Sequence, residues 1–216
     1  MFSPEDLAKI RAAVREAETR TRGEIVPMVV PASARYREAS HLAGLIAALL
    51  VLAVFLALSY GAGSGTWSQV HEGWIIVAVV VAYVLGSVVG TWSWSVRALT
   101  SDQRMAMKVR FRAERAFYEE GLHRTREATG VLIFLSLLER RVQVLADRAI
   151  HERVPAGTWD GLVEQIVAGV REGRPTESLC DAIARCGALL ASHFPVRDGD
   201  NPNELPDDLV RGVDGE

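Results

Sequence analysis

The sequence predicts an α/β domain, folded as a sandwich, that is interrupted by a two-helix transmembrane hairpin. Two uncharged apolar runs, residues 42–58 and 74–92, are each about long enough to cross the hydrocarbon layer of a membrane. One helix and one strand are expected before them, and strands and helices after them. Because a helix and a single strand cannot bury a core, we expect both flanks of the hairpin to complete one sheet on the same side of the membrane.

Composition and charge exclude several classes of protein. The chain has 216 residues, of which 49% are hydrophobic, and the excess is concentrated in the two apolar runs, so there is room for one ordinary domain beside them. A formal net charge of -3 argues against a nucleic-acid-binding protein, which would carry a basic balance. Cys180 and Cys186 lie six positions apart in one predicted helix. That rise separates them by roughly 9 Å, too far for a disulfide.

Residues 1–40 are predicted to be the first part of the α/β domain. Apolar residues recur at helical spacing between Ser3, which signals a helix start, and Gly23, which closes the helix. The run EIVPMVV at residues 24–30 is rich in residues that favour strands. Since Pro27 has no N–H for the ladder, it predicts an edge position or a bulge.

Residues 41–96 are predicted to be the transmembrane hairpin, with spans at about 42–60 and 74–93. The connector GAGSGTWSQVHEG lacks Lys and Arg, whereas arginines flank the outer ends of the pair. Under the positive-inside rule, both termini are cytoplasmic and the connector is external. We therefore expect a multi-pass protein of the cell inner (cytoplasmic) membrane. No signal peptide is expected, because a polar structured segment comes first.

A ridge of small residues recurs every four positions on the second span, at Ala82, Gly86 and Gly90. Such a ridge lets another helix approach closely. Two partners remain open: the first span of the same hairpin, which has small residues of its own, and a second copy of the chain in a homodimer.

Residues 97–195 are predicted to be the remainder of the α/β domain. A long helix starts at Ser101 and ends near Gly121, and the apolar run VLIFLSLL after Gly130 lacks alternation, as in a strand covered on both faces. The segment VQVLAD returns as a second strand, and two further helices follow. Residues 196–216 are acidic and contain glycine and proline, which predicts a tail that is flexible or loosely docked.

Three segments carry a resemblance to a known family: GEIVPMVV with RYREAS, the run AERAFYEEGLHRTREATGVLIFLSLLERRVQVLADRAIHERVP, and HFPVRDGDNPNELPDDL. Together they resemble the TPM domain family, which includes thylakoid proteins of photosystem II repair and auxiliary subunits of a membrane receptor. The order of elements is similar in particular to the bacterial membrane-protein branch, in which a hairpin splits the domain.

The resemblance implies a Rossmann-like α/β/α sandwich with a mixed sheet. It also implies kinship with proteins that are described as acid phosphatases or that bind calcium. Many relatives have a glycine-rich turn after the second strand of the β-hairpin, where this chain has Ala146-Asp147-Arg148-Ala149-Ile150. This difference argues against carrying phosphatase chemistry over to the chain.

Asp147 and Arg148 are the candidate catalytic residues, because they follow a sheet strand, where open α/β folds commonly place ligand crevices. The carboxylate of Asp147 would act as a nucleophile or metal ligand, and Arg148 or Arg124 would orient a phosphate. The plainer interpretation is that the Asp-Arg pair caps the next helical turn.

Basic residues around the long helix are candidates for binding an anion or lipid headgroups. His123, Arg124 and Arg126 lie between that helix and a strand, and Arg104 and Lys108 lie in the first half of the helix. Near an anionic membrane surface each basic residue contributes roughly 1 kcal/mol. A solvated surface is the alternative.

Familiar hydrolase signatures are missing from the sequence, while the anchor signal is strong. We therefore expect a non-catalytic interaction or membrane-complex maintenance module that contacts membrane lipid and a protein partner, with no nucleic acid and no cofactor. The alternative is a metal-assisted phosphatase, a phosphomonoester hydrolase that uses a divalent metal such as calcium or magnesium.

Overall fold

The computed structural model describes residues 2–61, 72–155, 157–196 and 204–212. The chain divides into two compact units. The first joins Met1–Ala34 to Ala106–Glu216, and the second is Arg35–Met105. The first unit is an α/β fold and the second is helical, and each is described below by itself.

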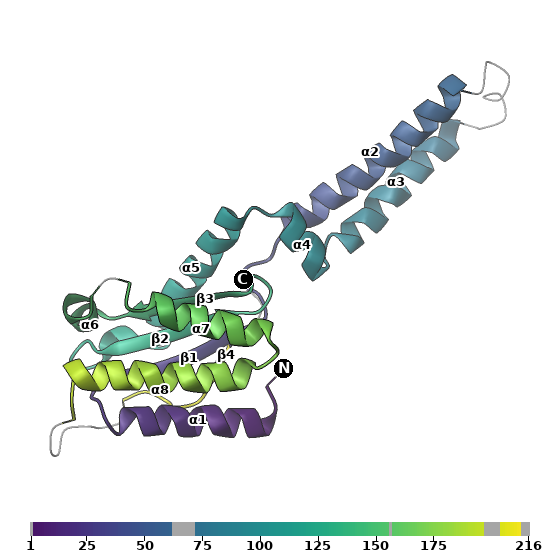
Figure 1. Ribbon diagram of the computed structural model, residues 1–216. Helices are drawn as coiled ribbons and strands as arrows, with labels where there is room; N and C mark the ends of the chain where they lie inside the picture. Colours follow the sequence, from purple (N-terminus) through teal and green to yellow (C-terminus); the bar gives the residue numbers. More distant parts are fainter. Residues whose placement is uncertain (1, 62–71, 156, 197–203, 213–216) are drawn as a thin grey trace. The chain divides into compact units, whose positions relative to one another are not determined.

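The sheet of the α/β unit has the strand order β3-β2-β1-β4 (Figure 1). β1 (Glu24–Val30) pairs in parallel with β2 (Gly130–Ser136), from Glu24 beside Gly130 to Val30 beside Ser136. β2 pairs antiparallel with β3 (Arg141–Ala146), and β1 pairs in parallel with β4 (Val210–Arg211). The mixed sheet, built from strands on both flanks of the apolar runs, confirms the predicted fold class.

Helices cover both faces of this sheet (Figure 1). Ile25 and Val29 of β1 face one core, which α1, α7 and α8 complete, while Val26 and Met28 face a second core beneath α5. The alternation buries all seven residues of β1. The helical elements of this unit are α1 (Pro4–Glu18), α5 (Asp102–Glu119) from Ala106 onward, η2 (Leu122–Arg124), α6 (Arg148–Arg153), α7 (Asp160–Arg171) and α8 (Pro175–His193).

β1 has a neighbour on each side, but Pro27 lies on a stretch of β1 that is an edge locally, as the sequence suggested. The carbonyl oxygen of Val29 accepts a 3.1 Å hydrogen bond from the N–H of Gly212, on the side of β4. Pro27 lies two residues earlier and so faces the same side. β4 pairs only with Met28 and Val29 and does not extend to Pro27. The missing N–H therefore costs the sheet no hydrogen bond.

The described part of the C-terminal segment, residues 204–212, is structured, which corrects the expectation of a flexible tail for these residues. It contributes β4 to the sheet, and it buries Leu209 and Asp207. Local sequence favoured flexibility because acidic residues and proline dominate, but contacts with α1 and β1 override that preference. The rest of the predicted tail lies largely outside the described residues.

The helical unit is a hairpin of α2 (Arg37–Gly61) and α3 (Glu72–Val89), followed by the short α4 (Ser93–Leu99). Within the described residues, one helix, Arg37–Leu58, is long and apolar enough to cross a membrane. Gly73–Val89 is long and apolar enough only when it is counted together with Ser93–Leu99, and the two helices are bent by 100° at the break between them. The second predicted span, 74–93, therefore ends as a helix at Val89.

The ridge of small residues packs within the hairpin. A Cβ placed on Gly86 would lie 2.6 Å from the Cβ of Ala47, and one on Gly90 would lie 2.7 Å from the Cα of Ser40. Both contacts are to α2, so α3 uses this face to pack against its own chain. A homodimer, the alternative partner of the ridge, would need another face of the hairpin.

Candidate functional site

Asp147 caps a helix. It follows β3 and is the N-cap of α6, where the N–H of Arg148 donates a 2.6 Å hydrogen bond to Oδ1. Arg148 is exposed and pairs along its own helix with Glu152, at 3.2 Å between Nε and Oε1. These contacts are the capping arrangement that was the plainer interpretation of the pair. One atom has no such role: Oδ2 of Asp147 is buried and has no hydrogen-bond partner in the structure.

The direction of β3 places Asp147 at the opposite end of the sheet from the usual ligand crevice. The N–H of Asp147 donates a 2.9 Å hydrogen bond to the carbonyl of Gly130, the first residue of β2. Asp147 therefore lies at the amino ends of the parallel strands. Ligand crevices in open α/β sheets lie outside the carboxyl ends. Asp147 was chosen from the sequence because it ends a strand. Since β3 runs antiparallel to β2, its carboxyl end lies at the opposite end of the sheet from the carboxyl ends of β1 and β2.

A buried polar cluster lies at the carboxyl ends of β1 and β2, and sequence reasoning missed it. Glu139, in the turn between β2 and β3, is only 6% exposed. Its Oε1 accepts a 3.0 Å hydrogen bond from the N–H of Ser33, and its Oε2 accepts one from the hydroxyl of Ser136. The cluster fixes the segment that leaves β1 to the end of β2. The only sequence signal was an acidic residue in a tight turn, which is usually exposed.

The basic residues of the η2 region make separate contacts. The ring of His123 lies 5.1 Å from that of Tyr118, and Nε of Arg124 donates to Nε2 of His123 at 3.3 Å. Arg126 turns to the C-terminal segment, where its N–H donates to Glu204 at 2.9 Å and its side chain pairs with the same carboxylate at 3.5 Å. The positive charge of Arg126 is therefore compensated within the fold.

The two helical candidates differ in their contacts. Arg104 belongs to the helical unit and pairs there with Glu38, at 2.6 Å between Nη1 and Oε2. Both partners are largely exposed, so this ion pair is weak. Lys108 belongs to the α/β unit and is exposed on α5.

A group of buried carboxylates holds the C-terminal segment against α1 and β1. Glu18 and Glu24 are 9% and 4% exposed, and Asp207 is 7% exposed. Burial raises the pKa of Glu18 to about 8 and also raises that of Glu24. Glu24 accepts hydrogen bonds from the N–H groups of Glu204 and Leu205, at 3.3 and 3.4 Å. The local sequence around Glu18 and Glu24 did not predict that they hold the C-terminal segment, because that segment lies about 180 positions away.

Within the described residues, no three His, Cys, Asp or Glu side chains are placed to share a metal ion. The acidic side chains of the buried group are engaged in other contacts: Asp207 accepts from Nε of Arg15 at 2.6 Å, and Glu18 accepts from a backbone N–H. The residues described do not fit a calcium or magnesium site, so no reaction step is assigned to a metal.

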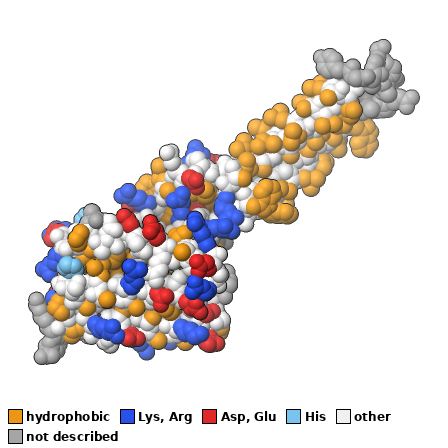
Figure 2. Space-filling view, viewed as in Figure 1, with side chains coloured by type: hydrophobic (Ala, Val, Ile, Leu, Met, Phe, Trp, Pro, Cys, Tyr) orange, Lys and Arg blue, Asp and Glu red, His pale blue; other side chains and the backbone are white. Residues whose placement is uncertain are grey.

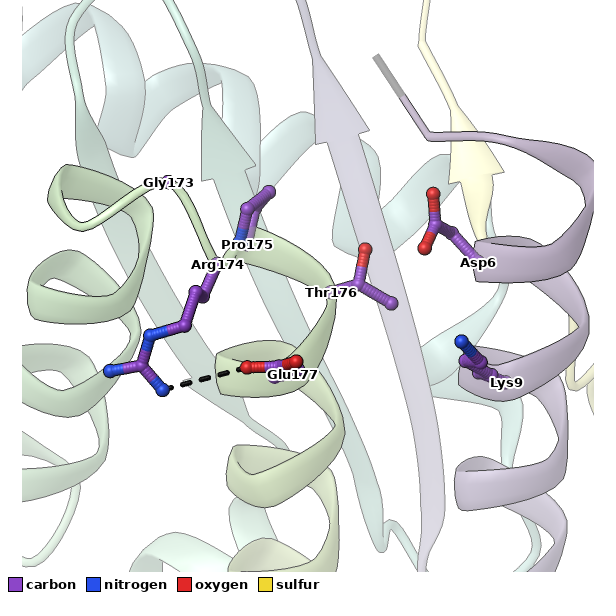
Figure 3. A pocket seen from close by; sticks show the side chains of 7 residues that line it. All are labelled: Asp6, Lys9, Gly173, Arg174, Pro175, Thr176 and Glu177. Carbon is purple, nitrogen blue, oxygen red and sulfur yellow. Dashed lines mark hydrogen bonds and ion pairs between the residues drawn. The ribbon is translucent and has the colours of Figure 1, made fainter.

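A hollow of about 310 Å³ lies between the first turns of α1 and α8 (Figure 3). Its charges are mixed, and its cations have partners: Lys9 pairs with Glu5 at 3.0 Å, and Arg174 pairs with Glu172 and Glu177. None of the residues proposed from the sequence lines it. The lining residues are Asp6, Lys9, Gly173, Arg174, Pro175, Thr176 and Glu177.

The fold and these sites define an α/β sandwich domain whose sheet is completed across an inserted apolar hairpin. The family model of the TPM domain matches residues 92–189. These residues therefore carry a TPM domain, as the sequence suggested.

The structure is similar to the NMR structure of the BA42 protein from the psychrophilic bacterium Bizionia argentinensis. The TM-score is 0.59 with 18% sequence identity, and the match covers 98% of this chain and 96% of that one. At this identity the likeness is one of fold. No curated protein matches the chain.

Proposed function

We propose that the protein is a membrane-anchored interaction module, with a cytoplasmic TPM domain that binds a protein partner or maintains a membrane complex and does not act as an enzyme. The observation that carries the proposal is the pairing of β1 with β2 along seven residues. These strands lie on either side of Arg37–Leu58, the helix that could cross a membrane.

Because β1 and β2 pair, the chain between them must cross any membrane an even number of times. Residues 24–30 and 130–136 form one ladder, so they must lie on the same side of any membrane. If Arg37–Leu58 crosses once, the chain must cross back before β2, and residues 73–89 are the apolar segment available. The side chains of the hairpin suit that placement, since Leu50 and Ile76 are 62% and 66% exposed and apolar groups cover its surface (Figure 2).

A test of the anchor places single cysteines in the full chain in spheroplasts, at Lys9→Cys in α1 and at Ser64→Cys in the connector, whose residues lie mostly outside those described. The reagent is a membrane-impermeant maleimide, and Cys180 and Cys186 are first replaced by alanine. Labelling at position 64 in intact spheroplasts, and at position 9 only after lysis, is expected. Labelling of both positions without lysis would contradict two crossings.

The non-catalytic part of the proposal is supported by the contacts of Asp147. This residue caps α6, it lies at the amino ends of the parallel strands, and Arg148 points to Glu152. Within the described part of the chain, these are the contacts of a helix N-cap and of the turn that follows it. A helix cap explains both residues without a substrate.

A phosphomonoesterase is the second candidate, and one atom favours it: the buried Oδ2 of Asp147, which has no partner. The test is hydrolysis of a chromogenic phosphate ester by the purified full chain, with calcium, with magnesium and with chelator. Asp147→Asn keeps a capping side chain and removes the charge, so it separates chemistry from folding. We expect no turnover in any of these conditions. If the wild type hydrolyses the ester and Asp147→Asn does not, the protein is a phosphomonoesterase and the non-catalytic proposal is wrong.

A further inference from the structure

The exposed face of α5 carries a stripe of large apolar side chains. Met107, Phe111 and Tyr118 are 56%, 60% and 65% exposed. Their spacing of four and seven residues places them along one line on a helix of 3.6 residues per turn. Val109, Ala113 and Ala116 are buried against the sheet on the opposite face of the same helix. α5 is therefore apolar on two faces, of which the α/β unit covers one.

This stripe accounts for most of the exposed large apolar surface of the α/β unit. Among the described residues of that unit, four large apolar side chains are exposed, and Met107, Phe111 and Tyr118 are three of them. The fourth is Val196. Single exposed apolar residues are ordinary, but three on one helical line mark an interaction surface.

Basic residues border the stripe. At 100° per residue, Lys108 and Arg115 fall on one flank of it, and Lys108 is exposed, whereas Arg115 pairs with Glu119 at 2.6 Å. On the other flank Arg110 and Glu114 pair with each other at 2.7 Å. The α5 sequence DQRMAMKVRFRAERAFYE contains five basic and three acidic residues, so the helix has a net positive charge of two. An apolar line with a cationic flank is the pattern of helices that lie in the interface of an anionic bilayer.

The chain also brings α5 near a bilayer if the hairpin enters one. Only two residues separate Leu99, the end of α4, from Asp102, the start of α5. We propose that α5 rests on an anionic lipid surface, with Met107, Phe111 and Tyr118 in the headgroup layer and Lys108 on a lipid phosphate. This inference rests on the proposed membrane anchor. It names the lipid-contacting residues, three of them apolar, and does not need the 123–126 loop, where Glu204 compensates Arg126.

The test uses the full chain in nanodiscs of phosphatidylcholine, with or without phosphatidylglycerol. An environment-sensitive fluorophore is attached at Phe111→Cys, and the control site is Arg171→Cys, exposed on α7. Cys180 is replaced by serine in both, while Cys186 is buried. Quenching by acrylamide reports contact with water, and quenching by nitroxide-bearing lipid reports contact with the bilayer.

In anionic discs we expect the fluorophore at position 111 to be quenched by the lipid nitroxide and shielded from acrylamide, while position 171 shows the reverse. Replacing Lys108 by glutamine is expected to shift the ratio of bound to free helix by about fivefold. In nanodiscs without phosphatidylglycerol, the ratio of bound to free helix should likewise be lower than in anionic nanodiscs.

Equal access of acrylamide to positions 111 and 171 in anionic discs would overturn the inference. So would shielding of position 111 from acrylamide without quenching by the lipid nitroxide, because it would mean that a second copy or another protein covers the stripe. A chain that does not enter nanodiscs at all would instead reject the membrane anchor, so the two failures are distinguishable.

Discussion

The N–H of Ile25 in β1 donates a 2.9 Å hydrogen bond to Oε1 of Glu18, the last residue of α1. The backbone N–H of Ile25 points toward the edge of β1 on which β4 pairs, but β4 pairs only with Met28 and Val29 and does not reach Ile25. The carboxyl group of Glu18 therefore accepts the hydrogen bond that a backbone carbonyl of a longer β4 would otherwise accept. Burial of Glu18, with Glu24 and Asp207 nearby, raises its pKa to about 8.

This raised pKa predicts that the α/β unit loses stability as the pH rises. The native state binds a proton on Glu18 that the unfolded chain releases near pH 4.5, so the stabilisation is complete below pH about 4.5 and is lost as the pH rises to about 8. Over this window we expect Glu18 to lower the free energy of unfolding by on the order of 3 kcal/mol. Urea unfolding of the full chain in mild detergent at several pH values measures it.

Glu18→Gln isolates this contribution, because the amide oxygen still accepts from Ile25 and carries no titratable proton. The variant should match the wild type near pH 4.5 and be the more stable of the two near pH 8. Glu16→Gln, at an exposed position on the same helix, is the control. Parallel pH profiles for the wild type and Glu18→Gln would show that Glu18 does not titrate in this window.

The C-terminal segment is expected to stabilise the α/β unit through Leu209. This side chain is 8% exposed and packs in the core shared with α1 and α8. Leu209→Ala should lower the free energy of unfolding by about 2 kcal/mol, since it removes buried methyl groups and leaves a cavity. Val196→Ala, at a position that is 40% exposed, should change it by less than about 0.5 kcal/mol. Similar unfolding midpoints for the two variants would mean that residues 204–212 do not fold with the core.

The strands on both sides of the hairpin could be predicted because their patterns are local. The run Val131–Leu135 is apolar without alternation, which indicates burial on both faces, and the structure buries each of these residues. β4 had no such pattern, because its two residues, Val210 and Arg211, lie in an acidic stretch. Contacts with residues some 180 positions away form it, and local sequence does not encode them.

The candidate sites were harder to predict for the same reason. That Asp147 ends a strand could be predicted, but which end of the sheet it occupies depends on the antiparallel pairing of β3 with β2. Arg126 was expected to be free for an anion, and its partner Glu204 lies 78 residues away. Glu139 had no signal, because its burial follows from the segment that leaves β1 closing over the β2–β3 turn.

Two glycines of α7 should respond in opposite ways to alanine. A Cβ on Gly169 would lie 2.2 Å from the Cβ of Ser178 in α8, so Gly169→Ala should force the helices apart and cost about 1–3 kcal/mol. A Cβ on Gly161 meets nothing within 4 Å, and Gly161→Ala should be neutral or stabilise by up to about 1 kcal/mol. Unfolding in urea compares them. Equal effects would contradict the close approach of α7 and α8.

The hairpin offers the matching comparison within α3. A Cβ on Gly86 would lie 2.6 Å from the Cβ of Ala47 and 2.9 Å from the carbonyl oxygen of Ala43, whereas one on Gly73 would meet nothing within 4 Å. Small residues at such crossings let two apolar helices pack by van der Waals contact, and lipid gives no hydrophobic force to hold them otherwise. Gly86→Val should therefore weaken the pairing of α2 with α3.

The measurement for this pair is the loss of helical signal as a harsh detergent replaces a mild one. Gly86→Val is expected to cost about 1–3 kcal/mol and to lower the harsh-detergent fraction at the midpoint, while Gly73→Val should leave it unchanged. A β-branched residue is present in both variants, so the difference reports packing and not helix propensity. If the two midpoints coincide, the ridge at Gly86 is not the contact that holds the hairpin together.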